Sequence, residues 1–360
     1  MKKFLEMHQV TLTAIGPVFI GSGKMLMKKE YILDKKNRQV SVVDLEKFFQ
    51  FLNRENKLES YEQFVLKENA PLHVWLKKHG IVNHHIKEFT AYVLDSGDLG
   101  ELNRVTNMAL FQKDPYGRPY IPGSSLKGAL RTIVLGNKIC SNLKNYEEDR
   151  RRICAAKYWH RASYLSKEMA DLERRAFSSE KGKKNSMCGL RISDSKPLSV
   201  KNLTLCQKVD VDVKGKENDL PIVRECLKPG TEVQFTMTID RGECDFSVEE
   251  IRQSINIFLQ NYNELFLEKF SSETLFEKNV IYLGGGAGFV SKTVLHPLLK
   301  SQPQRVRTVS RVIDSTLSRD AKNKHKHFQD ERLGVSPHVC KLTQFEGRLY
   351  QMGACRIEIV

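Results

Sequence analysis

A short run near the first third of the chain combines a helix start, two hydroxyls and two cations. A Pro-Gly pair at 122–123 interrupts an extended segment, and Ser124 and Ser125 follow, where their hydroxyls are expected to cap the helix. Lys127 and Arg131 are four residues apart, so they share one helix face. Because free backbone N–H groups at a helix N-terminus attract anions, this spacing indicates an anion site. An ordinary capped helix with a solvated basic edge is the alternative.

A second candidate phosphate contact is the Gly-Gly-Gly-Ala-Gly run at 284–288, which lies between a predicted strand at 280–283 and a predicted helix from about Phe289. The dinucleotide fingerprint fails because it would need a glycine at Phe289, and no glycine precedes a Lys-Ser/Thr pair as a P-loop requires. NTP hydrolysis is therefore unsupported. The remaining interpretations are a backbone that lies close to a sugar-phosphate chain, or a tight structural turn.

The charge of the chain favours a polyanionic partner. The 360 residues carry a formal net charge of +15. Residues 124–184 hold 15 basic and 7 acidic side chains, and residues 300–341 hold 10 and 4. A field this concentrated suits nucleic acid, because phosphate neutralisation supplies most non-specific affinity.

The cysteines and the N-terminus indicate the compartment. Eight cysteines are well separated, with no C-x-x-C pair, which is typical of neither a zinc ribbon nor a disulfide framework. A reducing cytosol is the simplest setting. The uncharged run at 7–23 is too short and too polar to span a bilayer, so we expect a cytoplasmic protein with no membrane partner.

The histidines lack the spacing of a strong metal site, so we expect no metal and no cofactor. His296, just past the glycine run, is the best-placed ribonuclease base, because cleavage by the 2′-hydroxyl needs no metal. A helix residue before Pro297 is the plainer interpretation of it. The groups that could be assembled into a metal site only on paper are His84, His85, His296, His325, His327, His338 and Cys340.

Strands and two amphipathic helices must position these motifs. Strands are predicted at 10–15, 188–193, 203–213, 231–239 and 355–360, with a hairpin over 31–43 and a small loop at 21–24. Asp44 can cap a helix over 45–52, and Ser247 with Glu250 forms a capping box that opens another. The β-α-β-β-α-β-like order is compatible with an α+β fold, an insertion-rich ferredoxin-like sheet of the kind seen in RRM modules.

This order predicts a discontinuous core with two insertions. The core comprises residues 1–43, 111–140 and 188–360. Residues 44–110 form a helical insertion, and residues 141–187 form a basic helical insertion.

The Ile-Pro-Gly-Ser-Ser-Leu-Lys-Gly-Ala-Leu-Arg run at 121–131 is similar to a signature of the RAMP proteins (repeat-associated mysterious proteins) of CRISPR systems. Three further pieces agree, namely Gly-Ser-Gly at 21–23, Arg-Ile-Ser-Asp-Ser at 191–195 and the glycine run at 284–288. With Arg-Leu-Gly-Val-Ser-Pro at 332–337, the set resembles the subfamily that forms the fifth Csm subunit of type III-A effector complexes.

The resemblance implies a RAMP core with the RRM-like fold that binds the 3′ region of the CRISPR RNA without reading its sequence. It implies a place at one end of a filament, beside backbone and small subunits of the Csm complex and near the target RNA. The guide contacts that the resemblance implies are Ser22, Lys24, Gly123, Ser124, Ser125, Lys127, Arg131, Gly284, Gly285, Gly286, Gly288 and Lys292.

The same resemblance argues against catalysis. The backbone relative cuts target RNA with a loop aspartate after its first strand, whereas the stretch 24–33 holds Glu30 and no aspartate. Asp34 lies within the predicted hairpin instead. We therefore expect a non-catalytic RNA-binding subunit that caps the filament for antiviral defence. A metal-independent ribonuclease that processes CRISPR RNA precursors and a purely structural protein-protein cap remain open.

Overall fold

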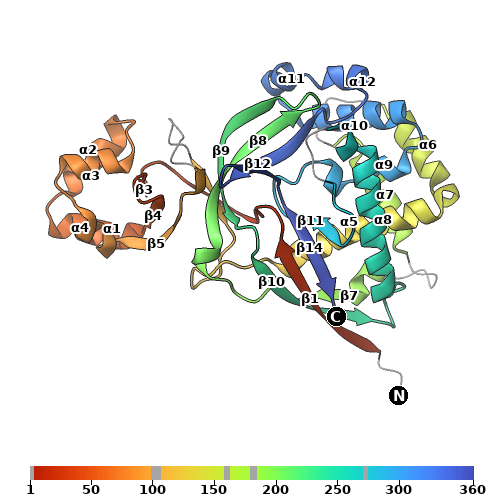
Figure 1. Ribbon diagram of the computed structural model, residues 1–360, viewed down its shortest axis with the longest axis horizontal. Coiled ribbons are helices and arrows are strands. Elements are labelled where there is room, and N and C mark those ends of the chain that lie inside the picture. Colours follow the sequence, from red (N-terminus) through yellow and green to blue (C-terminus); the bar gives the residue numbers. More distant parts are fainter. Residues whose placement is uncertain (1–3, 99–106, 158–162, 179–184, 271–274) are drawn as a thin grey trace.

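The chain forms two β-sheets with helices packed around them (Figure 1). The computed structural model describes residues 4–98, 107–157, 163–178, 185–270 and 275–360. The expected α+β class is confirmed. Each predicted insertion, 44–110 and 141–187, includes residues outside the described ranges.

A five-stranded sheet contains the first and last strands of the chain. Its order is β11-β14-β1-β10-β7, and every pair in it is antiparallel. Val10 and Leu12 alternate with more exposed residues and enter the main apolar core. The bounds are β1 Leu5–Ala14, β7 Leu190–Ile192, β10 Glu232–Asp240, β11 Val280–Tyr282 and β14 Ala354–Ile359.

Two long helices, α5 (Gly123–Ser141) and α8 (Val248–Leu265), contribute to the same core. The predicted capping box of α8 is confirmed, because Ser247 and Glu250 each accept a hydrogen bond from the other's backbone N–H. In α5, Leu126, Leu130 and Ile133 recur at helical spacing and are buried, as the pattern predicts.

A nine-stranded sheet has the order β2-β6-β9-β8-β5-β4-β3, with β12 paired to β8 and β13 paired to β12. The loop predicted at 21–24 is instead the start of β2, because Gly23 (φ +79°) lies where the pairing register shifts and absorbs a bulge. The bounds are β2 Gly21–Leu26, β3 Tyr31–Asp34, β4 Gln39–Val43, β5 Thr90–Asp95, β6 Met108–Phe111, β8 Leu203–Asp212, β9 Glu217–Leu227, β12 Val339–Phe345 and β13 Arg348–Gln351.

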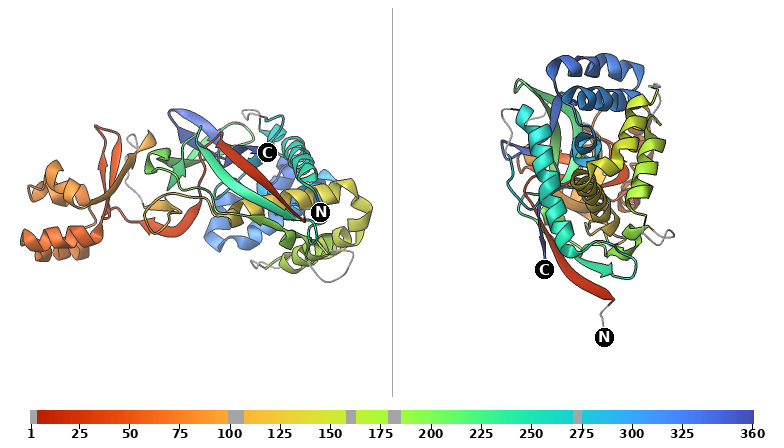
Figure 2. Two further views of the ribbon diagram at one scale, coloured as in Figure 1. Left: turned by 90° about the horizontal axis from the view of Figure 1, so that it is seen from below. Right: turned by 90° about the vertical axis from the view of Figure 1, so that its right-hand side faces the viewer.

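Four helices between β4 and β5 form a lobe that projects from one end of the molecule (Figure 2). They are α1 Leu45–Arg54, α2 Leu58–Lys67, α3 Leu72–Lys78 and α4 Asn83–Glu88. The prediction that Asp44 caps the first of them is confirmed, since Lys47 N donates to Asp44 Oδ1 at 3.2 Å. The lobe has an apolar core of its own, built around Phe48, Phe64 and Trp75.

The remaining helices are short, apart from α10. After β11, the expected helix from about Phe289 is wrong, because extended Thr293 separates a single 3₁₀ turn from a four-residue helix that contains Pro297. The bounds are η2 Leu143–Tyr146, α6 Glu147–Ala155, α7 Ser166–Ala176, η3 Ser186–Gly189, η4 Val200–Asn202, η5 Leu267–Lys269, η6 Val290–Lys292, α9 Leu295–Leu298, α10 Gln302–Thr316, α11 Arg319–His325, η7 His327–Gln329 and α12 Asp330–Leu333.

Candidate anion-binding surface

The start of α5 is capped by a carboxylate that comes from another part of the chain. The helix begins at Gly123, after Pro122, whose side chain has no hydrogen-bonding group. Asp194, which follows β7, accepts a hydrogen bond from Gly123 N at 2.8 Å. A Cβ at position 123 would lie 2.2 Å from the Ile192 carbonyl oxygen, so glycine permits this close approach. One backbone N–H of the predicted anion site is therefore already bonded to an anion of the protein.

The side chains on this helix face differ in what they contact. Ser124 and Ser125 lie inside the first turn and make no side-chain capping bond, so the prediction that they cap the helix is wrong. Pro122 holds the N-cap position, so the helix starts two residues earlier than it would with Ser124 as its cap. Within the described chain, Lys127 has no ion-pair partner, whereas Arg131 pairs with Glu173 of α7. Lys127 is available to an anion, while Arg131 would first have to leave a carboxylate.

The basic segment after α5 neutralises much of its own charge. Arg152 lies 3.1 Å from Asp171, and Arg175 pairs with the buried carboxylate of Asp149. Lys138 of α5 likewise pairs with Asp245 at 3.1 Å. The local excess of basic residues therefore overstates the positive charge that a partner would meet here.

The glycine-rich loop after β11 lies against the protein's own backbone. Gly285 N donates to the Phe19 carbonyl oxygen at 2.7 Å. A Cβ on Gly284 would lie 2.2 Å from that same oxygen, and one on Gly286 would lie 2.4 Å from Met352 Sδ. These close approaches, together with positive φ at both residues, explain why glycine stands there. The structural-turn interpretation thus has direct support.

Cationic side chains surround this loop. Lys292 Nζ donates to the Gly284 carbonyl oxygen at 2.5 Å. Half-buried Arg224 of β9 lies with its guanidinium 5.4 Å from the centre of the Phe19 ring and 3.4 Å from Met352 Sδ. Burial lowers the pKa of Arg224. Among the described residues, no carboxylate lies within ion-pair distance of Arg224. A partly buried guanidinium without an anionic partner is a ready contact for phosphate.

The neighbouring strands add two lysines on the same face as Arg224. Cys206 of β8 pairs with Arg224, so Lys208 and Asp210, two and four residues later on β8, lie on the same face of the sheet. Lys341 of β12 pairs with Asp210. Buried Asp210 lies 2.7 Å from Lys341 and 3.4 Å from Lys208, so one carboxylate serves two ammonium groups. Burial, with the charge of Lys341, lowers the pKa of Lys208 to about 8. We call Lys208, Arg224, Lys292 and Lys341 the basic face.

Backbone hydrogen bonds connect β2, which carries the predicted contacts Ser22 and Lys24, to the segment before α5. Ser22 Oγ donates to a β6 carbonyl oxygen at 3.1 Å, and exposed Lys24 has no ion-pair partner in the described chain. Their strand begins one residue after Ile20, whose carbonyl oxygen accepts from Gln112 N at 2.8 Å. The Gln112 carbonyl oxygen accepts in turn from Tyr120 N, just before α5. The glycine-rich loop joins this set because Gly285 N donates to the carbonyl oxygen of Phe19, next to Ile20. The fold therefore brings together the glycine-rich loop, β2 and the start of α5, which are far apart in the sequence.

Sequence reasoning missed four residues of this surface, namely Asp194, Lys208, Arg224 and Lys341. Arg224 sits in a strand of mixed polar and apolar residues, and nothing local distinguishes it from a solvated cation. Asp194 belongs to the Arg-Ile-Ser-Asp-Ser run that the sequence singled out, but its partner at position 123 is 71 residues away.

The acid and base candidates for catalysis are either buried or hydrogen-bonded within the protein. His296 is buried, and burial lowers its pKa to about 4, so it cannot reach a surface phosphodiester. The interpretation of His296 as a helix residue before Pro297 is confirmed. Glu30 accepts from Met27 N at 2.6 Å, and Asp34 lies in the hairpin, where it accepts from Asn37 Nδ2 at 2.7 Å.

In the part of the chain that the structure describes, no helix has both the length and the apolar run needed to cross a bilayer.

A family model and two curated relatives point to the same family. A family model described as the RAMP superfamily matches residues 11–291. The CRISPR system Cms protein Csm5 of Enterococcus italicus is 30% identical, over 98% of this chain and 97% of that protein. Its counterpart from Mycobacterium tuberculosis is 28% identical, over 100% and 99%.

Solved structures show the same fold. A chain in a cryo-EM structure of a Csm-crRNA-target RNA ternary complex of a type III-A CRISPR-Cas system matches with a TM-score of 0.69 at 18% identity, covering 98% of this chain and 100% of that chain. The crystal structure of T. onnurineus Csm5 matches with a TM-score of 0.59 at 18% identity, over 96% and 99%.

Proposed function

The chain belongs to the RAMP superfamily, within it to the Csm5 family, and from this premise we propose that it is a non-catalytic RNA-binding subunit of a type III-A CRISPR (Csm) effector ribonucleoprotein. It binds the 3′ region of the CRISPR RNA and caps the backbone filament for antiviral defence. Its neighbours are backbone and small subunits, with target RNA close by. All eight cysteines carry free thiols, which supports a place in the reducing cytoplasm.

The observation that carries the proposal is the set of cations without carboxylate partners. Arg224, Lys24 and Lys127 have no ion pair within the described residues, although many other cations of the chain do. Phosphate oxygens would supply the missing counter-charge, and such contacts hold a strand without reading its bases.

The remaining proposed contacts complete the path of the guide. Ser124 is exposed and Ser125 half-buried on the first turn of α5, and their hydroxyls suit phosphate or ribose oxygens. Arg131 joins them by exchanging Glu173 for phosphate. The remaining contacts lie on β2, at the start of α5 and in the loop after β11. They are Ser22, Lys292 and the backbone at Gly123 and Gly284–Gly288.

We assign the five-stranded sheet to a ferredoxin-like (RRM-like) core. Without β11 its order is β14-β1-β10-β7, with α5 after β1 and α8 after β10, and this supports a β-α-β-β-α-β unit. The core comprises residues 1–43, 111–140 and 188–360. The helical insertion is 44–110 and the basic one is 141–187.

The decisive experiment removes two of these cations. We expect Lys127→Ala with Arg224→Ala to weaken binding of the CRISPR RNA by about 100-fold or more, since each of the two charged hydrogen bonds that are lost contributes about 1.5–3 kcal/mol. The salt slope of log affinity should fall by about two, because two phosphate contacts are lost. Fluorescence anisotropy on purified protein at several salt concentrations measures the affinity and its salt slope. The guide content of purified complexes shows whether the guide is retained.

A matched variant removes the same charge elsewhere. Lys67→Ala with Lys78→Ala takes two exposed lysines from the helical lobe and should leave both affinity and slope unchanged. Equal losses in both variants would mean that only net charge matters. No loss in either would favour the purely structural cap. Defined cleavage of guide precursor in chelator would favour the ribonuclease.

The lowered pKa of Lys208 gives the basic face a pH dependence. A lysine with a pKa of about 8 is mostly charged at pH 7 and mostly neutral at pH 9, so RNA affinity should fall over this interval. We expect a loss of about fivefold, the equivalent of one modest hydrogen bond. Lys208→Arg should retain its affinity at pH 9, and anisotropy at both pH values compares the two proteins. An equal loss in both would exclude Lys208 as the cause.

A further inference from the structure

Two histidines from the C-terminal region, His327 and His338, meet at the buried carboxylate of Asp330. Asp330, the first residue of α12, is fully buried. Its Oδ2 lies 3.1 Å from Nδ1 of His327 in η7, and its Oδ1 lies 2.5 Å from Nδ1 of His338, just before β12. His327 is buried and His338 is half-buried. Three metal-ligating groups thus converge without the sequence spacing of a known metal motif.

The charge of this cluster is not balanced by lysine or arginine. Within the described residues, the ion-pair partners of Asp330 are the two imidazoles alone. A buried carboxylate needs hydrogen-bond donors or a bound cation around it, and the two imidazoles here fill a position that a metal ion could also occupy.

We propose that His327, Asp330 and His338 bind a divalent transition metal ion, with zinc as the best match. The three ligand atoms all lie within 4.8 Å of one another. In a tetrahedral zinc site with bonds of about 2.0–2.1 Å, ligand atoms are about 3.3 Å apart. Small shifts of side chains would therefore convert the hydrogen-bonded cluster into three ligands. Nitrogen and carboxylate donors suit zinc.

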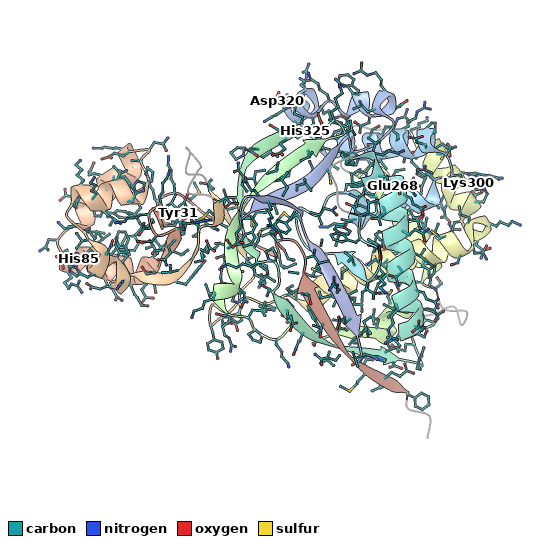
Figure 3. All side chains as sticks on the ribbon, in the orientation of Figure 1. Tyr31, His85, Glu268, Lys300, Asp320 and His325 are labelled. Carbon is teal, nitrogen blue, oxygen red and sulfur yellow. The ribbon has the colours of Figure 1, made fainter. Side chains whose placement is uncertain are left out.

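The surroundings provide access and a fourth position. His338 lines a cavity of about 410 Å³, together with His325 and Gln329. His325 ends α11 above β8 and β12 (Figure 3). A water molecule in this cavity would complete the tetrahedron. On binding, the metal takes the place of the proton on each Nδ1. A neutral ring changes tautomer, so that its one proton moves to Nε2, and a doubly protonated ring releases one proton to solvent.

A metal here would fasten the α12 segment to the start of β12. Lys341 of the basic face lies three residues after His338 on that strand. The metal site stands apart from the RNA-binding proposal, because its residues and its readout differ from those of the guide contacts.

Titration of the chelator-treated, full-length protein with zinc chloride tests the proposal. Calorimetry and elemental analysis should give one zinc per chain, and Co²⁺ should give the strong visible absorption of a tetrahedral site. Asp330→Asn and His338→Gln should each weaken binding by about 100-fold or more, since even groups that only support a ligand contribute 10- to 100-fold.

Two control variants separate this site from adventitious binding. His84→Asn with His85→Asn removes two adjacent histidines of the helical lobe, and Cys154→Ser with Cys188→Ser removes the exposed thiols. Both should bind zinc as the unaltered protein does. Weak or substoichiometric zinc in the unaltered protein, with octahedral Co²⁺, would overturn the proposal even if the variants fail to fold. Unchanged binding by folded Asp330→Asn would overturn it as well.

Discussion

Trp75→Ala should unfold the helical lobe while the five-stranded sheet stays folded. The Trp75 side chain is 2% exposed and packs edge-on against Tyr61 and Phe48, at ring distances of 5.3 and 6.5 Å. Truncating a buried tryptophan costs about 3–5 kcal/mol. Because these aromatic residues form a core separate from that of the long helices, the loss should stay local.

Hydrogen exchange measured by mass spectrometry checks this prediction. Amides of α1–α4 should lose protection, and those of β1 and β10 should keep it. Phe49→Ala is the matched control, since the Phe49 side chain in the same helical lobe is 42% exposed and its loss should change little. Loss of protection in β1 as well would show that the lobe and the sheet unfold as one unit.

Gly284→Ala should destabilise the loop after β11 by about 3 kcal/mol. The residue has φ +78°, which an alanine adopts at a cost, and the new Cβ would lie 2.2 Å from the Phe19 carbonyl oxygen. The Gly285–Phe19 hydrogen bond should break as the loop moves away. Chemical denaturation measures the stability loss, and exchange of the amide at 285 locates it.

The same variant separates the structural role of the loop from its charge. Lys292 reaches the Gly284 carbonyl oxygen, so displacement of the loop should also lower RNA affinity. Gly215→Ala is the matched control, because Gly215 also has positive φ (+78°) but a Cβ there would meet nothing within 4 Å. Equal destabilisation by both would assign the effect to backbone conformation rather than to contact with Phe19.

Several elements could be predicted because their causes lie within a few residues. Asp44 caps α1, Ser247 and Glu250 form the capping box of α8, and the apolar spacing of α5 puts one face into the core. The run at 121–131 also predicted the family, because a signature is a property of consecutive residues. The prediction of a loop at 21–24 was wrong, because a glycine bulge in a strand and a glycine turn have similar local sequences.

Local sequence was enough to predict the caps of α1 and α8, the strands of the five-stranded sheet, the 31–43 hairpin, the excess of positive charge and the family. The tertiary structure alone decided which charges are free. Arg131 pairs with Glu173, 42 positions further along the chain, whereas Arg224 lies over an aromatic ring and has no ion pair with any carboxylate that the structure describes. The fold also places Nδ1 of His338 2.5 Å from Oδ1 of Asp330. The physical reason is that charge pairing, burial and close backbone approach depend on neighbours in space, and the fold supplies those from distant parts of the chain.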